Sequence, residues 1–206
     1  MEKQQEKIGD PRRAAILQAA FDVFVEKGFD AATTAEIVRR ARISKRTLYE
    51  FFASKQEILT ALVRYGAARM QPSPELPEPQ NKAQFLAVLE QFGRIFLSEL
   101  LHPERTAMYR LAIAEAARGG GSVARELEAG GRAPVTRAVT RFFEAAAARG
   151  VIRRDDIATL ISVFFSVLIG ITPLQALLGE PPISAEAAAL RAGLAAQVLA
   201  RMMEPA

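Results

Sequence analysis

The sequence predicts an all-α protein built from a small N-terminal helical domain and a larger C-terminal helical domain. Three observations lead to this prediction. Apolar residues recur at helical spacing along most of the 206 residues, and no stretch of useful length alternates apolar and polar side chains as a strand would. Four prolines crowd into QPSPELPEPQ, which cannot lie inside a helix. We therefore expect residues 71–81 to be the linker or loop between the two domains.

The composition is that of an ordinary globular protein, with 50% apolar and 24% charged residues. The chain contains no cysteine, which excludes a disulfide framework and thiol catalysis. Residues 1–10 are polar and mixed in charge, so a disordered arm is expected there rather than a signal peptide. The most apolar stretch, 157–171, is too short for a membrane span and is followed closely by Pro173. We expect a cytoplasmic protein with no membrane partner.

The positive charge is concentrated in the first third of the chain. The net charge is +4, and residues 1–70 hold 13 Lys and Arg against 9 Asp and Glu, whereas the remainder holds 14 of each. A local basic cluster is what a polyanionic partner requires, although a solvated charged face is the commoner explanation of a charge run. The stretch from Ile37 to Tyr49 carries five cations and no acid: Arg39, Arg40, Arg42, Lys45 and Arg46.

Residues 11–53 are expected to form a compact group of three helices. Between Pro11 and Lys27 the apolar residues fall on one helical stripe, and Gly28 stops it. The Thr33-Thr34-Ala35-Glu36 stretch fits a capping box that opens a short helix over 33–41. Arg42-Ile43 breaks this helix, and Ser44 is a suitable N-cap for the next one, 44–51.

Two short helices joined by a tight turn and packed on a third form a helix-turn-helix. In such a motif the second helix enters the major groove of DNA with its N-terminal residues at the base edges. The N-terminus of the first helix favours phosphate. The sequence ISKRTLYEFF at 43–52 fits this plan. Lys45, Arg46 and Thr47 are donors at the groove end, Tyr49 is free to reach phosphate, and Leu48, Phe51 and Phe52 anchor the helix.

The rest of the chain is predicted to be helical. A second capping box at Ser54 opens a connecting helix over 54–70. The domain at 82–206 should contain helices around Phe85 and Met108, one helix kinked at Pro134 or two helices within 122–149, a strongly apolar helix over about 155–178, and a last helix from Ser184.

Residues 16–59, ILQAAFDVFVEKGFDAATTAEIVRRARISKRTLYEFFASKQEIL, closely resemble the DNA-binding domain of the TetR (tetracycline repressor) family. The ending Tyr49-Glu50-Phe51-Phe52-Ala53-Ser54-Lys55 is the most diagnostic part. The resemblance implies an all-helical homodimer that represses transcription from a palindromic double-stranded DNA operator. The residues expected to bind DNA are Thr33, Thr34, Arg42, Ser44, Lys45, Arg46, Thr47, Tyr49 and Lys55. Of these, Arg46 and Thr47 occupy positions that vary with the operator.

Arg42 departs from the family pattern, which usually has glycine at this turn. Glycine suits a left-handed backbone, and a Cβ there costs about 1 kcal/mol. Arg42 therefore stands either as an additional cation for phosphate or as a tolerated substitution with a solvated side chain.

The resemblance also implies a C-terminal domain that often binds a small-molecule effector. Bundles of this kind can leave a cavity between helices, and the low charge on the apolar stripes favours a largely apolar effector, although such residues are more often plain core. The candidate pocket residues are Phe85, Leu89, Phe92, Phe96, Met108, Leu111, Phe143 and Phe165. The expected dimer interface is a four-helix bundle formed through Leu160, Phe164, Leu168, Leu190, Leu194 and Val198.

An enzyme is a poor alternative. The single histidine, His102, precedes a proline at an expected helix end, and GGGS at 119–122 lacks the lysine of a phosphate-binding loop. No spacing of carboxylates suggests a catalytic pair, so we expect no metal and no cofactor. A DNA-binding regulator that needs no ligand, or that activates transcription, is the alternative that stays open.

Overall fold

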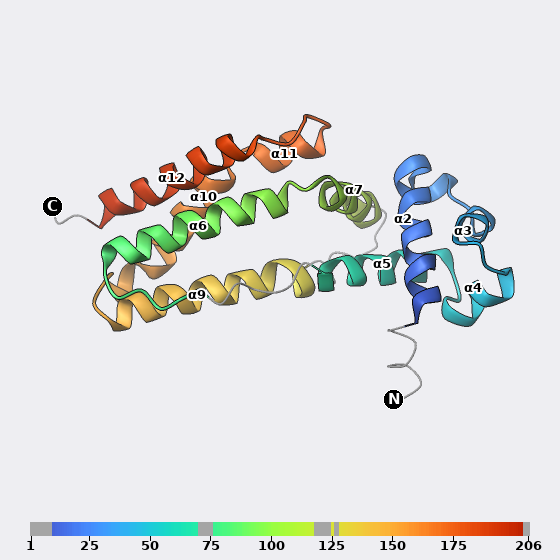
Figure 1. Cartoon of the computed structure of the whole chain (residues 1–206), viewed down its shortest axis with the longest axis horizontal. Helices are drawn as coiled ribbons and strands as arrows, with labels where there is room; N and C mark the ends of the chain where they lie inside the picture. The colour runs from blue at the N-terminus through green and yellow to red at the C-terminus, as the bar shows by residue number, and fades with distance from the viewer. Residues whose placement is uncertain (1–9, 70–75, 118–124, 126–127, 204–206) are drawn as a thin grey trace. The chain divides into compact units, whose positions relative to one another are not determined.

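The computed structural model describes residues 10–69, 76–117, 125 and 128–203. Every regular element within these ranges is a helix (Figure 1), which confirms the all-α prediction. Most of the predicted arm at 1–10, the first part of the proline-rich segment and the glycines at 119–121 lie outside the described residues. The longer helices are α2 (Pro11–Ala31), α3 (Thr34–Ala41), α4 (Lys45–Phe51), α5 (Lys55–Arg69), α6 (Lys82–Leu100), α7 (Pro103–Ala117), α9 (Ala133–Ala148), α10 (Ile157–Ile169), α11 (Thr172–Leu177) and α12 (Ala185–Met202).

The chain divides into two compact units. Unit 1 comprises residues 1–71 and 107–131, and unit 2 comprises 72–106 and 132–206. The sequence interpretation assigns residues 107–131 to the C-terminal domain, whereas in the structure this segment belongs to the same compact unit as the N-terminal helices. Met108 and Leu111 of α7 are the reason, since both are buried in the same apolar cluster as α2 and α5.

Unit 1 is built around the apolar stripe of α2. Ile16, Leu17 and Phe24 are fully buried, and α4 and α5 add Leu48 and Ile58 to the same cluster. The predicted stop in α2 is real, because Gly28 adopts φ 77° and ψ 161° and kinks the helix three residues before its end. A side chain would disfavour this left-handed backbone.

The N-terminus of α5 differs in detail from the predicted capping box. The Ser54 hydroxyl accepts a hydrogen bond from the Glu57 N–H at 3.1 Å, as expected. The Glu57 carboxylate, however, accepts from the Ala53 N–H at 2.7 Å rather than from Ser54. The exchange still satisfies two backbone donors at a helix start.

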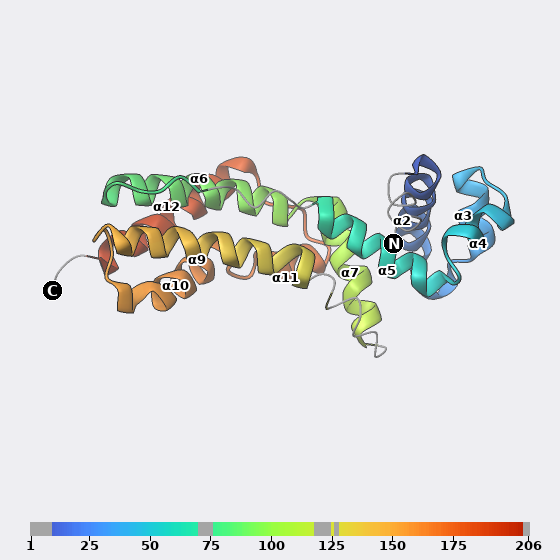
Figure 2. The same cartoon turned by 90° about the horizontal axis from the view of Figure 1, so that it is seen from below.

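Unit 2 contains a helical layer in which α12 packs against both α6 and α10, and α10 against α9 (Figures 1 and 2). Small residues permit the close approach of α6 and α12. A Cβ built on Gly93 would lie 2.9 Å from Leu168 Cδ1 and 3.2 Å from Ala192 Cβ, which is tighter than side chains tolerate without moving. Four alanines of α12 are buried: Ala188, Ala192, Ala195 and Ala196.

The predicted apolar helix over 155–178 is wrong as a single element. It is divided at Gly170, which has φ 51° and ψ −138° and ends α10, and α11 begins two residues later with Pro173 in its first turn. The Arg191 guanidinium donates to the Ile169 carbonyl at 3.2 Å, so α12 caps the freed end of α10. Pro134 lies in the first turn of α9, but the backbone before it is already helical, since the π-helical turn η1 (Glu128–Arg132) runs directly into α9. Within the described part of 122–149, Pro134 therefore lies inside a continuous helical run, at the point where it changes from π-helix to α-helix.

The candidate pocket residues divide between the two units. Met108 and Leu111 pack in the core of unit 1, and the other six pack in the core of unit 2. In unit 2, Phe85 is fully buried and meets the Phe143 ring edge-on at 5.0 Å between centroids. Phe92, Phe96 and Phe165 form a second group of rings with centroids 5.5–6.3 Å apart, of which Phe96 and Phe165 are only partly buried.

The predicted interface residues on α10 need correction. Leu160, Phe164 and Leu168 are at most 2% exposed and pack within unit 2 itself, so they present no surface to a second chain. On α12, Leu190 and Leu194 are 71% and 51% exposed, and Val198 is partly buried.

No described helix is both long enough and apolar enough to cross a membrane.

Candidate nucleic-acid interface

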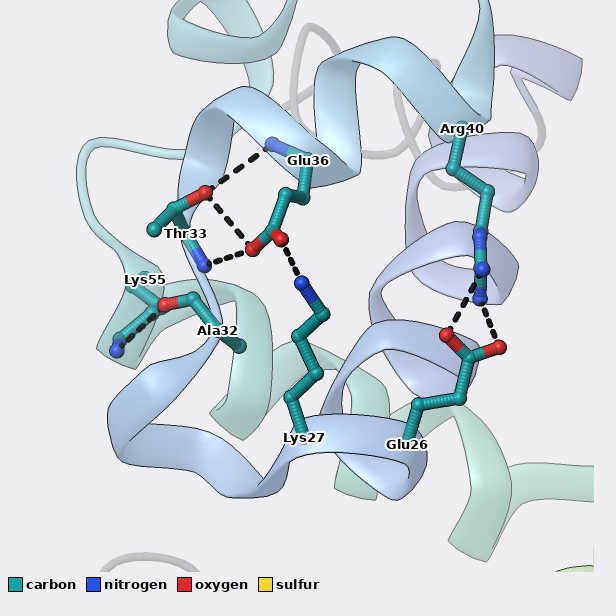
Figure 3. A network of polar contacts seen from close by, with 7 residues as sticks. All are labelled: Glu26, Lys27, Ala32, Thr33, Glu36, Arg40 and Lys55. Atoms are coloured by element: carbon teal, nitrogen blue, oxygen red, sulfur yellow. Dashed lines mark hydrogen bonds and ion pairs between the residues drawn. The ribbon is translucent and has the colours of Figure 1, made fainter.

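The start of α3 is fixed by a complete capping box. The Thr33 hydroxyl accepts from the Glu36 N–H at 3.2 Å, and the Glu36 carboxylate accepts from the Thr33 N–H at 3.0 Å. Lys27 of α2 forms an ion pair with the same carboxylate (Figure 3). The hydrogen bonds from Lys27 and Thr33 lower the pKa of Glu36 to about 2, so this carboxylate stays charged at neutral pH and ties α3 to α2.

These bonds change the role predicted for Thr33. A threonine offers one backbone N–H and one hydroxyl proton, and both are directed to Glu36, since the hydroxyl also lies 2.9 Å from the carboxylate. Thr33 therefore orients α3 and has no donor to offer a phosphate. The amides of Thr34 and Ala35 stand in the first turn of α3, where helix amides lack intrahelical acceptors and favour anions.

The turn between α3 and α4 has the left-handed conformation that the family resemblance implies. Arg42 adopts φ 55° and ψ 44° and is the one described non-glycine residue with a positive φ. Its N–H donates to the Arg39 carbonyl at 3.3 Å, and the Ile43 N–H donates to the Val38 carbonyl at 3.2 Å, which is the pattern of a Schellman ending. The Arg42 side chain is exposed, so its charge is available at the turn.

Ser44 and Thr47 fix the start of α4. The Ser44 hydroxyl accepts from the Thr47 N–H at 3.0 Å, and the two hydroxyls are 2.8 Å apart. The predicted N-cap is confirmed. One of the two hydroxyl protons is used in this contact, and Thr47 is partly buried, so the pair mainly sets the direction of α4.

The outer face of α4 carries four exposed side chains: Lys45, Arg46, Tyr49 and Glu50. They fall one turn apart in two rows, the spacing that puts residues on one helix face. The Lys45 ammonium lies 5.9 Å from the centroid of the Tyr49 ring, a cation–π contact. The Arg46 Nε donates to Glu50 Oε1 at 3.1 Å, and the Arg46 side chain remains 89% exposed.

The inner face of α4 is held by the core and by α2. Leu48 is fully buried and Phe52 is 2% exposed, which confirms their predicted role as anchors. The guanidinium of Arg12 lies 5.6 Å from the Phe51 ring centroid, and that of Arg13 lies 5.5 Å from the Phe52 ring centroid. The helix is therefore supported from behind while its donors face outward.

Arg40 is a clustered cation that pairs with a carboxylate of another helix. Arg40 donates two hydrogen bonds, of 2.6 and 2.9 Å, to the carboxylate of Glu26 on α2 (Figure 3). This pairing lowers the pKa of Glu26 and raises that of Arg40. The basic surface is thus formed by Arg39, Arg42, Lys45 and Arg46, all of which are exposed.

Lys55 directs its ammonium group at the protein's own backbone. Its ammonium group donates to the carbonyls of Phe29, Asp30 and Ala32 at 2.6, 3.0 and 2.9 Å. It also lies 4.5 Å from the centroid of the Phe29 ring, and Figure 3 shows it directed at the segment between α2 and α3. A lysine has three donors, and all are used here. Lys55 is a clamp on backbone carbonyls, and its contact with DNA stays a prediction.

Glu50 and Glu26 were missed by the sequence interpretation. Glu50 follows Arg46 by four residues, a spacing that predicts an ion pair on a helix. No sequence signal points to Glu26, which meets Arg40 only because α2 and α3 pack together. In the described part of the chain no group of three or more His, Cys, Asp and Glu side chains is placed to hold a metal ion.

Lys55→Met should destabilise the protein, because it leaves three carbonyls without their charged donor. Hydrogen bonds to charged groups contribute about 1.5–3 kcal/mol, and we expect a loss of about that size in urea unfolding monitored by circular dichroism. Lys45→Met serves as the matched control, since Lys45 contacts only an exposed ring, and it should unfold like the wild type. Equal midpoints for all three proteins would contradict the clamp.

Comparison with known proteins agrees with this geometry. The sequence model of the bacterial regulatory proteins of the tetR family matches residues 16–62, and that of the AefR-like transcriptional repressor C-terminal domain matches residues 87–202. The uncharacterized regulator YdeS of Bacillus subtilis is 39% identical over 75 residues, which cover 34% of this chain and 38% of YdeS. The chain thus matches less than half the length of this curated relative.

Solved structures resemble nearly the whole chain. A TetR transcriptional regulator from Agrobacterium tumefaciens has a TM-score of 0.82 and 27% identity, with 94% of each chain covered. The flavonoid-responsive regulator FrrA has a TM-score of 0.73 and 27% identity, with 94% of this chain and 97% of FrrA covered. The two family matches together span the helix-turn-helix and most of unit 2. The chain belongs to the TetR family of DNA-binding transcriptional regulators.

Proposed function

We propose that the protein is a dimeric repressor that holds a palindromic operator through α4 and leaves it when a small, largely apolar ligand binds. The proposal rests mainly on the side chains exposed on the outer face of α4. Lys45 and Arg46 are exposed at its N-terminal end, whereas Leu48 and Phe52 fix its inner face in the core. An exposed pair of cations on a firmly held helix is what major-groove recognition needs.

The donors around α4 divide into two groups. Arg46 presents a guanidinium that is suited to the O6 and N7 atoms of a guanine. Arg42 and the first amides of α3 are suited to phosphate, because a turn cation and a helix N-terminus both attract anions without regard to sequence. Lys45 and Tyr49 lie on the same face of α4 and complete the contact surface.

A second copy of the chain is the proposed partner of the exposed apolar surface of α11 and α12. One helix-turn-helix contacts few base pairs, and a two-fold dimer doubles the site. Arg191 of α12 donates to the Ile169 carbonyl at the end of α10, and α11 begins three residues after Ile169, at Thr172. The exposed apolar side chains in this region are Ile171, Leu174, Leu178, Leu190 and Leu194, which are 51–76% exposed. They replace the buried α10 residues in the expected interface.

The proposed ligand site lies within unit 2. Phe96 and Phe165 are partly buried beside Phe92, and aromatic edges and faces of this kind accept flat apolar molecules. The likeness to FrrA, whose name describes it as flavonoid-responsive, favours an aromatic ligand. The match to the C-terminal domain of AefR-like transcriptional repressors favours repression.

Helix α7 offers the route from ligand to DNA. It begins at Pro103 in unit 2, and its later residues belong to unit 1. There Glu115 accepts a hydrogen bond of 2.8 Å from Gln56 of α5, and α5 carries the Lys55 clamp at its start. A shift of α7 would therefore reach the support of α4, provided that the ligand binds the two conformations with different affinity.

The DNA-binding part of the proposal is tested with Arg46→Ala and Arg42→Gly. Operators are first selected from a random duplex library with the wild type. Arg46→Ala should then lose about 1–3 kcal/mol of affinity and relax the choice at one base pair. Arg42→Gly keeps the left-handed turn but removes a cation, so it should lower the salt slope by about one unit without changing base preference. Identical profiles for both variants would contradict the assigned roles.

The dimer is tested with Leu190→Glu. A carboxylate placed on the proposed apolar interface costs several kcal/mol if it is buried without a partner. We expect sedimentation velocity to show a monomer with greatly weakened operator binding. Ile113→Glu is the matched control, because Ile113 is a similarly exposed apolar residue of unit 1, and it should remain dimeric. A dimeric Leu190→Glu variant would place the interface elsewhere.

The ligand is tested by adding a panel of flavonoids and, separately, of saturated fatty acids to the operator complex while fluorescence anisotropy is followed. Release by an aromatic compound is expected, and Phe96→Ala should weaken it because one ring of the proposed site is removed. A coupling of about 1–3 kcal/mol corresponds to a 5–150-fold change in operator affinity. If Phe96→Ala responds like the wild type, these rings do not form the site.

A further inference from the structure

We propose that Glu50 is a specificity-determining residue that positions Arg46 for one base pair of the operator. The proposal rests on the proposed recognition of DNA by α4 and adds a residue to it. Both side chains lie on the exposed outer face of that helix, four residues apart. The observation behind it is the hydrogen bond of 3.1 Å from Arg46 Nε to Glu50 Oε1.

The atoms used in this bond matter more than its strength. An arginine has five N–H donors, one on Nε and four on the two Nη atoms. Because Glu50 takes the Nε–H, the forked Nη end of the guanidinium stays free to point away from the helix. That end fits the O6 and N7 atoms of guanine as a bidentate pair. The Arg46 side chain is 89% exposed, so the protein surface provides little other restraint on its direction.

An exposed ion pair of this kind adds little to the stability of the fold. Its effect on recognition is different, because a long side chain loses rotamer freedom when it binds, and a side chain that is already oriented loses less. Glu50 therefore contributes to affinity for the guanine without touching DNA. It is a positioning residue.

Glu50 also places a negative charge on the outer face of α4, which is the face proposed to meet DNA. The neighbouring cations on this side are Arg46 of its own helix and Arg12 of α2, whose charge interacts with that of Glu50. Repulsion between Glu50 and the DNA backbone lowers affinity for every sequence alike. Glu50 thus raises the preference for the operator over other DNA in two ways: it orients the Arg46 side chain, and it weakens non-specific binding.

Two variants separate these effects. Glu50→Ala removes both the acceptor and the charge, whereas Glu50→Gln removes the charge and keeps a carbonyl oxygen that can accept from Arg46 Nε. Both should bind random duplex DNA more tightly than the wild type at low salt. Glu50→Ala should lose at least about threefold in the ratio of affinities for the selected operator and for the operator with its guanine replaced. Glu50→Gln should keep most of that ratio.

The decisive control is a double-mutant cycle with Arg46→Ala. If Glu50 acts through Arg46, adding Glu50→Ala to Arg46→Ala should leave the ratio unchanged. Thermal melts should be alike for all variants, since Glu50 is exposed. An unchanged ratio in Glu50→Ala, equal losses in Glu50→Ala and Glu50→Gln, or a full loss on the Arg46→Ala background would each overturn the proposal. A wild type that selects no sequence would overturn the proposed function together with it.

Discussion

The Lys55 ammonium donates three hydrogen bonds to the carbonyls of Phe29, Asp30 and Ala32, and these bonds hold the start of α5 against the segment between α2 and α3. Gly28 breaks α2, and the few residues after it leave carbonyls that no helix can satisfy. A single cation from α5 supplies the missing donors. The start of α5 is thereby tied to the segment that leads into α3, and α4 lies between them in the sequence.

The polar side chains of unit 1 fall into two sets with opposite tasks. Thr33, Glu36, Ser44 and Lys55 direct their hydrogen-bonding atoms at the protein's own backbone. They fix where α3 and α4 begin, and they hold α3 against α2. The exposed cations at the turn and on α4 are left to meet a polyanion. A helix whose start, back and neighbours are fixed in this way loses little entropy when it binds DNA.

The all-helical fold and the start of each helix in the helix-turn-helix could be predicted from the sequence. The contacts that could not be predicted have physical causes. The two N-caps were predictable because they depend on contacts between close neighbours in the chain, whereas the left-handed turn at Arg42 was implied only by the resemblance to a family that usually has glycine there. The carbonyl partners of Lys55 could not be predicted because they lie more than twenty residues away in sequence. The α10 leucines were assigned to an interface because an apolar stripe identifies a buried face, but not whether the chain itself or a second copy buries it. Met108 and Leu111 show the same limit, since their spacing could not indicate which unit they join.

We infer that Lys55 stabilises the fold, whereas the exposed cations of α4 bind DNA. Nuclear magnetic resonance of the lysine ammonium groups, recorded on the free protein and on its complex with selected operator DNA, separates these two roles. We expect the Lys55 ammonium to exchange slowly with water in the free protein and to keep its resonance in the complex, whereas the Lys45 resonance moves. A rapidly exchanging Lys55 ammonium that becomes protected only when DNA is added would contradict it.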